Sequence, residues 1–93
     1  MTQRKFDEDM LHDLYQAFVR IDSESTCAQF LEDLCTRKEV EQMAQRLRAA
    51  NLLAQGKTYT QVIEQTNISS ATLSRVSRCV QYGEGYRKFV KTE

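Results

Sequence analysis

The side chains best suited to binding chemistry lie between residues 69 and 78. This segment combines hydroxyl groups with the guanidinium groups of Arg75 and Arg78, and no carboxylate lies between Glu64 and Glu84. Hydroxyl groups can bond to base edges or phosphates, and an arginine can pair with a phosphate or with the edge of a guanine. The pattern therefore predicts a surface that binds double-stranded DNA.

A helix-turn-helix over residues 58–82 is expected to position these groups. Thr58 with Gln61 three residues later predicts a capping box at the start of a short first helix. Asn67 tolerates the left-handed conformation that a tight turn requires, and Ser69 can cap the second helix. The shared core of the two helices is predicted to consist of Val62, Ile63, Ile68, Leu73 and Val76.

Most of the predicted DNA contacts lie on the second helix of the helix-turn-helix. One more lies on its first helix, and one lies on a central helix earlier in the chain. They are Arg46, Tyr59, Ser69, Ser70, Ala71, Thr72, Ser74, Arg75 and Arg78. The alternative is a plain helical hairpin with a solvated, serine-rich face. That alternative does not require the missing carboxylates, the asparagine turn and the arginine pair together.

The rest of the chain is predicted to be helical, because its 93 residues include no proline and only three glycines. Apolar periodicity predicts a first helix over residues 6–21, and Thr26 with Gln29 predicts the capping box of a second helix. After a break at residues 82–85, a short helix from Tyr86 to Lys91 is expected within the segment 84–93. We expect an all-α fold of about six helices in one domain, residues 1–93.

The central helix, predicted over residues 36–57, has clear signals at both ends. Thr36 and Glu39 form another predicted capping box, and Gly56 can supply the left-handed residue that closes the helix. Leu52 and Leu53 are expected to lie beside the apolar stripe and to broaden it. The stripe itself is predicted to be Val40, Met43, Ala44, Leu47, Ala50 and Ala54.

The formal net charge of +0 hides a strong asymmetry along the chain. Residues 1–36 hold three basic and eight acidic side chains, a net charge of −5, so residues 37–93 carry +5. We expect the basic part to meet a polyanion, with ordinary surface variation as the alternative. The acidic helices of residues 1–35 carry more apolar positions than a short domain can cover, which predicts that they join two copies in a homodimer.

Other classes of function are less well supported by the residues. His12 is the only histidine, lies among aspartates and has no evident nucleophile to activate, so no enzymatic activity is expected. The three cysteines lack paired spacing, and we expect neither a metal nor a cofactor. No apolar run spans a bilayer and no signal peptide is evident, which predicts a cytoplasmic, nucleoid-associated protein. A helical adaptor that binds other proteins remains the alternative function.

Several motifs together resemble the Trp repressor family, and most closely its small YerC/YecD branch. They lie between Leu34 and Gly83 and comprise the runs 36–39, 45–48, 52–59 and, most specifically, Ser69-Ser70-Ala71-Thr72-Leu73-Ser74-Arg75-Val76. The resemblance implies a homodimer with intertwined N-terminal helices that presents two recognition helices to successive major grooves. It also implies a role in transcriptional regulation, which we expect to be repression.

The resemblance does not extend to the tryptophan site of the family. Arg46 and Arg75 match the two arginines that hold this corepressor, and Thr36 matches a nearby threonine. However, Val76 stands where a glycine leaves room for the indole ring, and Cys79 replaces a serine that bonds to the ligand's amino group. Because a branched side chain fills the volume that the ring needs, tryptophan is not expected to act as a corepressor. Arg46 and Arg75 would then contact phosphates.

Overall fold

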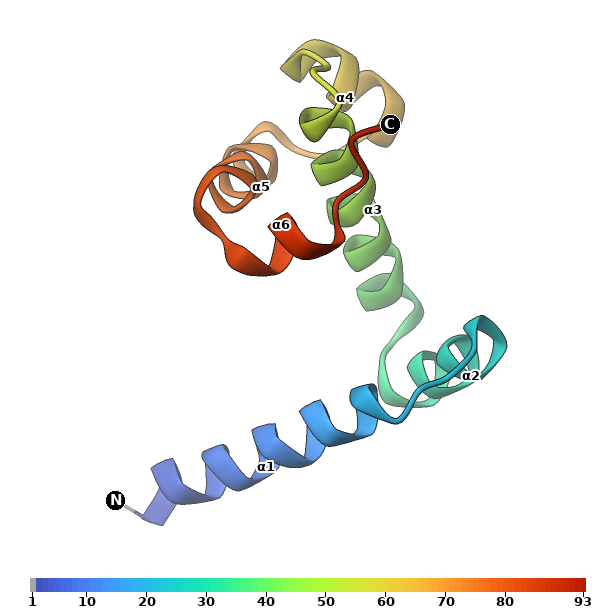
Figure 1. The fold of residues 1–93 in the computed structure, drawn as a ribbon, viewed down its shortest axis with the longest axis vertical. Helices are drawn as coiled ribbons and strands as arrows, with labels where there is room; N and C mark the ends of the chain where they lie inside the picture. The colour runs from blue at the N-terminus through green and yellow to red at the C-terminus, as the bar shows by residue number, and fades with distance from the viewer. Residues whose placement is uncertain (1) are drawn as a thin grey trace. The chain divides into compact units, whose positions relative to one another are not determined.

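The computed structural model describes residues 2–93, and the side chains of residues 7–93, as six helices without a strand. The helices form two compact units, one ending at Cys35 and the other running from Thr36 to Glu93 (Figure 1). The predicted all-α class and helix number are confirmed. No helix within the described residues has both the length and the apolar character needed to span a bilayer.

The N-terminal unit contains α1 (Thr2–Val19) and α2 (Glu24–Leu34). The two helices meet through Phe18 and Phe30, whose ring centroids lie 5.6 Å apart in an edge-to-face arrangement. The predicted cap of α2 at Thr26 is wrong, because Ser23 is the N-cap and its Oγ accepts a hydrogen bond from the Thr26 amide. The Thr26 hydroxyl is occupied as well, since it accepts a bond from Ser23 Oγ.

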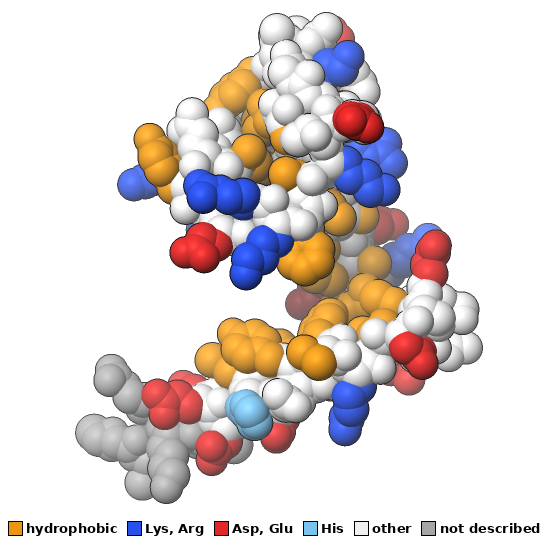
Figure 2. Space-filling model, viewed as in Figure 1, with side chains coloured by type: hydrophobic (Ala, Val, Ile, Leu, Met, Phe, Trp, Pro, Cys, Tyr) orange, Lys and Arg blue, Asp and Glu red, His pale blue; other side chains and the backbone are white. Residues whose placement is uncertain are grey.

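The N-terminal unit has no buried side chain among residues 7–35. Hydrophobic side chains instead group along one side of α1 and α2 (Figure 2). The large exposed ones are Met10, Leu11, Tyr15, Phe18, Val19 and Leu34. Two short helices that bury so little apolar surface lack the main contribution to folding stability.

The C-terminal unit contains α3 (Arg37–Ala54), α4 (Tyr59–Thr66), α5 (Ser70–Tyr82) and α6 (Glu84–Phe89). Helix α3 is central, because α4 and α5 both pack against it, while α6 follows and packs against α5. Four of the five apolar residues predicted for the helix-turn-helix core are buried, and Ile63 is half-buried at its edge. The full set of buried side chains is Ala49, Ala50, Leu52, Val62, Ile68, Leu73 and Val76.

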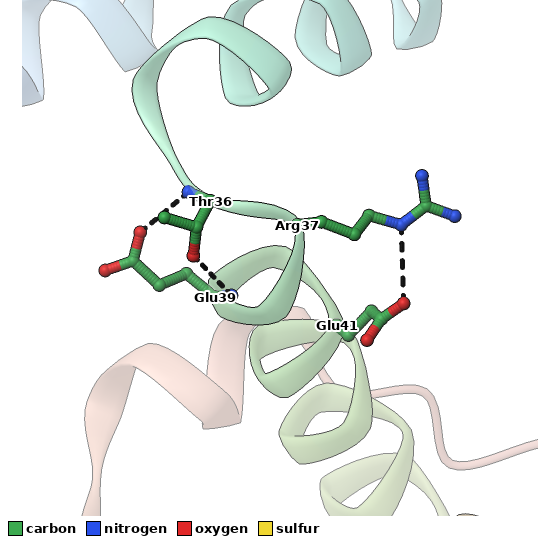
Figure 3. A network of polar contacts seen from close by, with 4 residues as sticks. All are labelled: Thr36, Arg37, Glu39 and Glu41. Atoms are coloured by element: carbon green, nitrogen blue, oxygen red, sulfur yellow. Dashed lines mark hydrogen bonds and ion pairs between the residues drawn. The ribbon is translucent and has the colours of Figure 1, made fainter.

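Capping fixes where α3 begins. Thr36 Oγ1 accepts a bond from the Glu39 amide at 3.1 Å, and the Glu39 carboxylate accepts one from the Thr36 amide at 2.8 Å (Figure 3). An exposed ion pair between Arg37 and Glu41 follows on the next turn. Gly56 has a φ of +89° after the last turn of α3, so the predicted capping box and left-handed closure are both confirmed.

The predicted apolar stripe of α3 is partly wrong. Ala50 is buried as expected, and so is Leu52, a residue expected to broaden the stripe. However, Ala44 and Leu47 are exposed, whereas Ala49, which lies outside the predicted stripe, belongs to the core. The reason is that α3 is covered by α4 and α5 along its C-terminal half, where the contact surface is wider than one stripe. The small Ala49 side chain permits this close approach between helices.

The predicted last helix is displaced, because α6 begins at Glu84 and ends at Phe89. Only Gly83 separates it from α5, and there a Cβ atom would lie 2.6 Å from the Cys79 carbonyl oxygen. The chain leaves the helix at Val90, which packs against the core. Next to it the Lys91 amide donates to Asn51 Oδ1 on α3, an interaction that ends α6 earlier than predicted.

Asn67→Ala is expected to destabilise the C-terminal unit, whereas Asn67→Gly is not. Asn67 has a φ of 61° and a ψ of 20°, a left-handed conformation that costs an ordinary residue about 1–2 kcal/mol. Urea unfolding should show a lower free energy of unfolding for the alanine variant by about 1 kcal/mol and little change for glycine. Equal stabilities of the two variants would show that the turn does not require this conformation.

Candidate nucleic-acid interface

A tight turn joins α4 to α5. Helix α4 ends at Thr66, Asn67 reverses the chain, and its amide donates to the Ile63 carbonyl at 2.8 Å. The Ile68 side chain is only 2% exposed and fills the core beneath the turn. Ser69 then caps α5, with its Oγ accepting a bond from the Thr72 amide at 3.2 Å. The asparagine turn and the serine cap are as predicted.

Burial on one side of α5 determines which side chains the other side presents. Leu73 and Val76, three residues apart, are both buried against α3 and α4. With 3.6 residues per turn, the opposite side of the helix must therefore be exposed. The predicted contact residues found exposed on α5 are Ser70, Ala71, Ser74, Arg75 and Arg78.

Ser69 and Thr72 are placed differently from the other predicted contacts. The Ser69 hydroxyl donates to Thr72 Oγ1 at 2.9 Å while accepting the Thr72 amide, so capping uses most of its bonding capacity. Thr72 is half-buried. Its hydroxyl hydrogen is the remaining donor of this pair, which stands at the N-terminal end of α5.

The other two predicted contact residues lie on different helices. Tyr59 is the first residue of α4, next to the Thr58 capping box, and its side chain is 44% exposed. Arg46 is exposed near the middle of α3. The structure thus brings five exposed residues of the predicted DNA-contact set together on α5 and places one such residue each on α3 and α4.

The guanidinium groups of this surface are not neutralised by carboxylates. Among residues 7–93 the single ion pair is Arg37 with Glu41, which leaves Arg46, Arg75 and Arg78 without an acidic partner in that range. Lys and Arg side chains stand at the surface in the region of α5 and α6 (Figure 2). Unpaired cations such as these are suited to phosphate groups, and Arg75 and Arg78 in addition lie on a helix without carboxylates.

An open apolar groove forms the second notable surface of the C-terminal unit. It is lined by Leu47, Cys79, Gly83, Gly85, Tyr86 and Phe89. Two of these side chains are well exposed, Leu47 at 44% and Phe89 at 75%. The last turn of α6 adds the basic residues Arg87 and Lys88 next to the groove. An apolar surface of this kind in a small unit is typical of a site that meets another protein surface.

Fold and surface together define a small, all-helical helix-turn-helix protein. The chain belongs to the Trp repressor protein family, whose model matches residues 9–93. The predicted family is confirmed. The chain is also similar to the protein YerC of Bacillus subtilis strain 168, with 40% identity over 73 residues that cover 78% of this chain and 70% of YerC.

Two crystal structures share this fold. One is a candidate Trp repressor from Staphylococcus aureus, with a TM-score of 0.83, 35% identity and coverage of 95% of this chain and 89% of that chain. The other is a TrpR-like protein from Eubacterium eligens, with a TM-score of 0.83, 34% identity and coverage of 91% and 89%. The similarity to Trp repressor-like proteins thus extends from the sequence to the fold.

Proposed function

We propose that this protein is a transcriptional regulator, acting as a repressor, that binds specific double-stranded DNA sites as a homodimer at the nucleoid in the cytoplasm. The observation that carries the proposal is the exposed face of α5, which presents small hydroxyl side chains and two unpaired arginines and no carboxylate. Membership of the Trp repressor family supports the same conclusion.

The size of the exposed side chains suits entry into a DNA groove. The major groove of B-DNA is about 12 Å wide, so a recognition helix with short side chains can approach the base edges closely. Ser70, Ala71 and Ser74 supply such a surface near the N-terminal end of α5. Arg75 and Arg78 lie about one and two turns after Ser70, where they can reach phosphates or guanine edges.

A homodimer would present two α5 helices to successive major grooves. Half-sites of helix-turn-helix dimers are spaced by about 34–36 Å, one turn of DNA. Support for dimerisation comes from the exposed apolar sides of α1 and α2 and from the apolar groove of the C-terminal unit. We propose that the acidic N-terminal helices of one copy cover the groove of another copy, with Arg87 and Lys88 beside it.

Tryptophan is not part of the proposed mechanism. Val76, which stands where the family has a glycine, is 2% exposed and packs in the core with Leu73. Without a buried ring the ligand would lose most of its apolar burial, on the order of 2–3 kcal/mol for a large aromatic group. We propose that the arginines Arg46 and Arg75 contact phosphates instead.

The proposal predicts that affinity for mixed-sequence duplex DNA falls steeply with salt, because binding releases counterions from the phosphates. Arg75→Ala should lower the slope of log affinity against log salt by about one unit per subunit. Its melting temperature should stay nearly unchanged, since the Arg75 side chain is exposed. Fluorescence anisotropy with labelled duplex at several salt concentrations measures both the affinity and the slope.

Two results would contradict the proposal. Absence of salt-dependent DNA affinity in the wild-type chain would favour a helical adaptor function. Unfolding of Arg75→Ala would show that the arginine is structural. The same titration with L-tryptophan tests the corepressor, and a tenfold gain in DNA affinity would contradict the role assigned to Val76.

A further inference from the structure

We infer that Gln45 is a positioning residue for DNA recognition, because its side-chain amide ties α3 to the turn from which α5 departs. The inference rests on the proposed DNA-binding function and adds a residue that does not itself face the nucleic acid. Gln45 Nε2 donates to the Thr66 carbonyl oxygen at 2.8 Å, across 21 residues of sequence. Both residues are half-buried.

The acceptor of this bond is a carbonyl group at the C-terminal end of α4, where carbonyl groups lack partners within the helix. The last four carbonyl groups of an α-helix have no acceptor role within the helix, and Thr66 is the last residue of α4. The Gln45 amide satisfies this carbonyl from the neighbouring helix. The partial positive charge of the amide hydrogens also lies at the negative end of the α4 dipole.

Thr66 anchors the turn through its side chain as well. Its Oγ1 donates to the Val62 carbonyl at 2.7 Å and accepts a bond from the Ile68 amide at 3.2 Å. One residue therefore receives the bond from α3, reaches back into α4 and holds the chain that leads to α5. Because Ser69 follows Ile68 directly and caps α5, a shift of Thr66 displaces the start of α5.

Core packing alone does not fix the position of the turn between α4 and α5. Leu73 and Val76 hold α5 against the core through apolar contacts, which are not directional. A recognition surface requires its groups within about 0.5 Å of the productive geometry. The directional bond from Gln45 constrains the turn in a way that the apolar contacts do not. The side chains at the N-terminal end of α5 lie nearest to the turn, so their positions depend most on this bond.

The substitution Gln45→Met tests this role, since methionine keeps the length and helix propensity of glutamine but cannot donate. Affinity for a duplex selected from a random pool should fall about tenfold, because each subunit would then have to order its turn on binding, at a cost of up to the net free energy of the lost bond. Affinity for mixed-sequence duplex should change less than about twofold, because it depends mainly on phosphate charge. The ratio of the two affinities is the readout that a merely structural role would not move.

Gln45→Glu and Gln42→Met are the matched variants. Glutamate is nearly isosteric but places a carboxylate against the Thr66 carbonyl, so it should reproduce the loss. Gln42 is exposed one turn earlier on α3, and its replacement should leave both affinities unchanged. Circular dichroism checks that all three variants keep the wild-type helix content.

Amide hydrogen exchange provides a measurement that does not depend on DNA. The amides of Asn67 and Ile68 should exchange several times faster in Gln45→Met than in the wild-type chain, while the Leu73 amide stays protected. Unchanged exchange at the turn, or an equal loss of specific and mixed-sequence affinity, would overturn the inference. If the wild-type chain binds no DNA, the proposed function fails, and the exchange rates alone decide whether Gln45 fixes the turn.

Discussion

Ser70→Glu is expected to abolish specific DNA binding while leaving the protein folded. Ser70 is the first residue of α5 and its side chain is exposed. A carboxylate there stabilises the helix, by about 0.3–1 kcal/mol, because it lies at the positive end of the helix dipole. The same charge in a homodimer would meet phosphates at two half-sites, and we expect at least a hundredfold loss of affinity, equivalent to about 3 kcal/mol per dimer.

Three variants compared by anisotropy and thermal melting separate charge from side-chain loss. Ser70→Ala removes only a hydrogen-bonding group, and its affinity should fall less than about tenfold. Gln16→Glu changes the net charge equally, but on the polar side of α1, and should bind like the wild-type chain. Wild-type affinity of Ser70→Glu would show that the N-terminal end of α5 does not face DNA.

The features of the fold that sequence predicts well are those set by residues close together in the chain. The capping boxes at Thr36 and Thr58 and the cap at Ser69 each depend on a partner three residues away. Asn67 is identified because few other residues tolerate its conformation. Even so, a local pattern is misleading at α2, where Thr26 and Gln29 predict a capping box but Ser23 is the N-cap.

The features that sequence does not predict depend on distant partners. Ala49 is buried because two helices cover α3, and a single periodic stripe cannot show that. The bond from the Lys91 amide to Asn51 Oδ1 spans 40 residues, and the one from Gln45 Nε2 to the Thr66 carbonyl spans 21. Gln45 reads locally as an ordinary polar residue next to Arg46, so nothing in its surroundings marks it as part of the turn.

The predicted DNA contacts divide in the same way. Periodicity with Leu73 and Val76 is sufficient to place Ser70, Ser74 and Arg75 on the exposed side of α5, because one helix determines both faces. Helix assignment alone does not reveal that Ser69 and Thr72 bond to each other. The face of a recognition helix is therefore more predictable than the availability of each hydroxyl group on it.

Leu11→Asp is expected to dissociate the proposed homodimer. The Leu11 side chain is 46% exposed in a single copy and lies on the apolar side of α1, seven residues before Phe18. Burial of a whole leucine side chain contributes about 1.5–3 kcal/mol, so the exposed half of Leu11 can contribute about 0.7–1.5 kcal/mol in each copy, and a symmetric interface would lose that contribution twice. The dissociation constant should therefore rise by at least about tenfold from the lost burial alone, and the cost of desolvating the two carboxylates raises it further.

Sedimentation velocity over a range of concentrations measures this change, with Gln16→Asp on the polar side of α1 as the control for added charge. The control should remain a dimer at the concentrations where Leu11→Asp is a monomer. Melting of the wild-type chain should also depend on concentration, because association stabilises the folded state. A wild-type chain that stays folded as a monomer at micromolar concentration would contradict the dimer. The exposed apolar side of α1 would then have to be covered by a different protein, since residues 7–35 include no buried side chain.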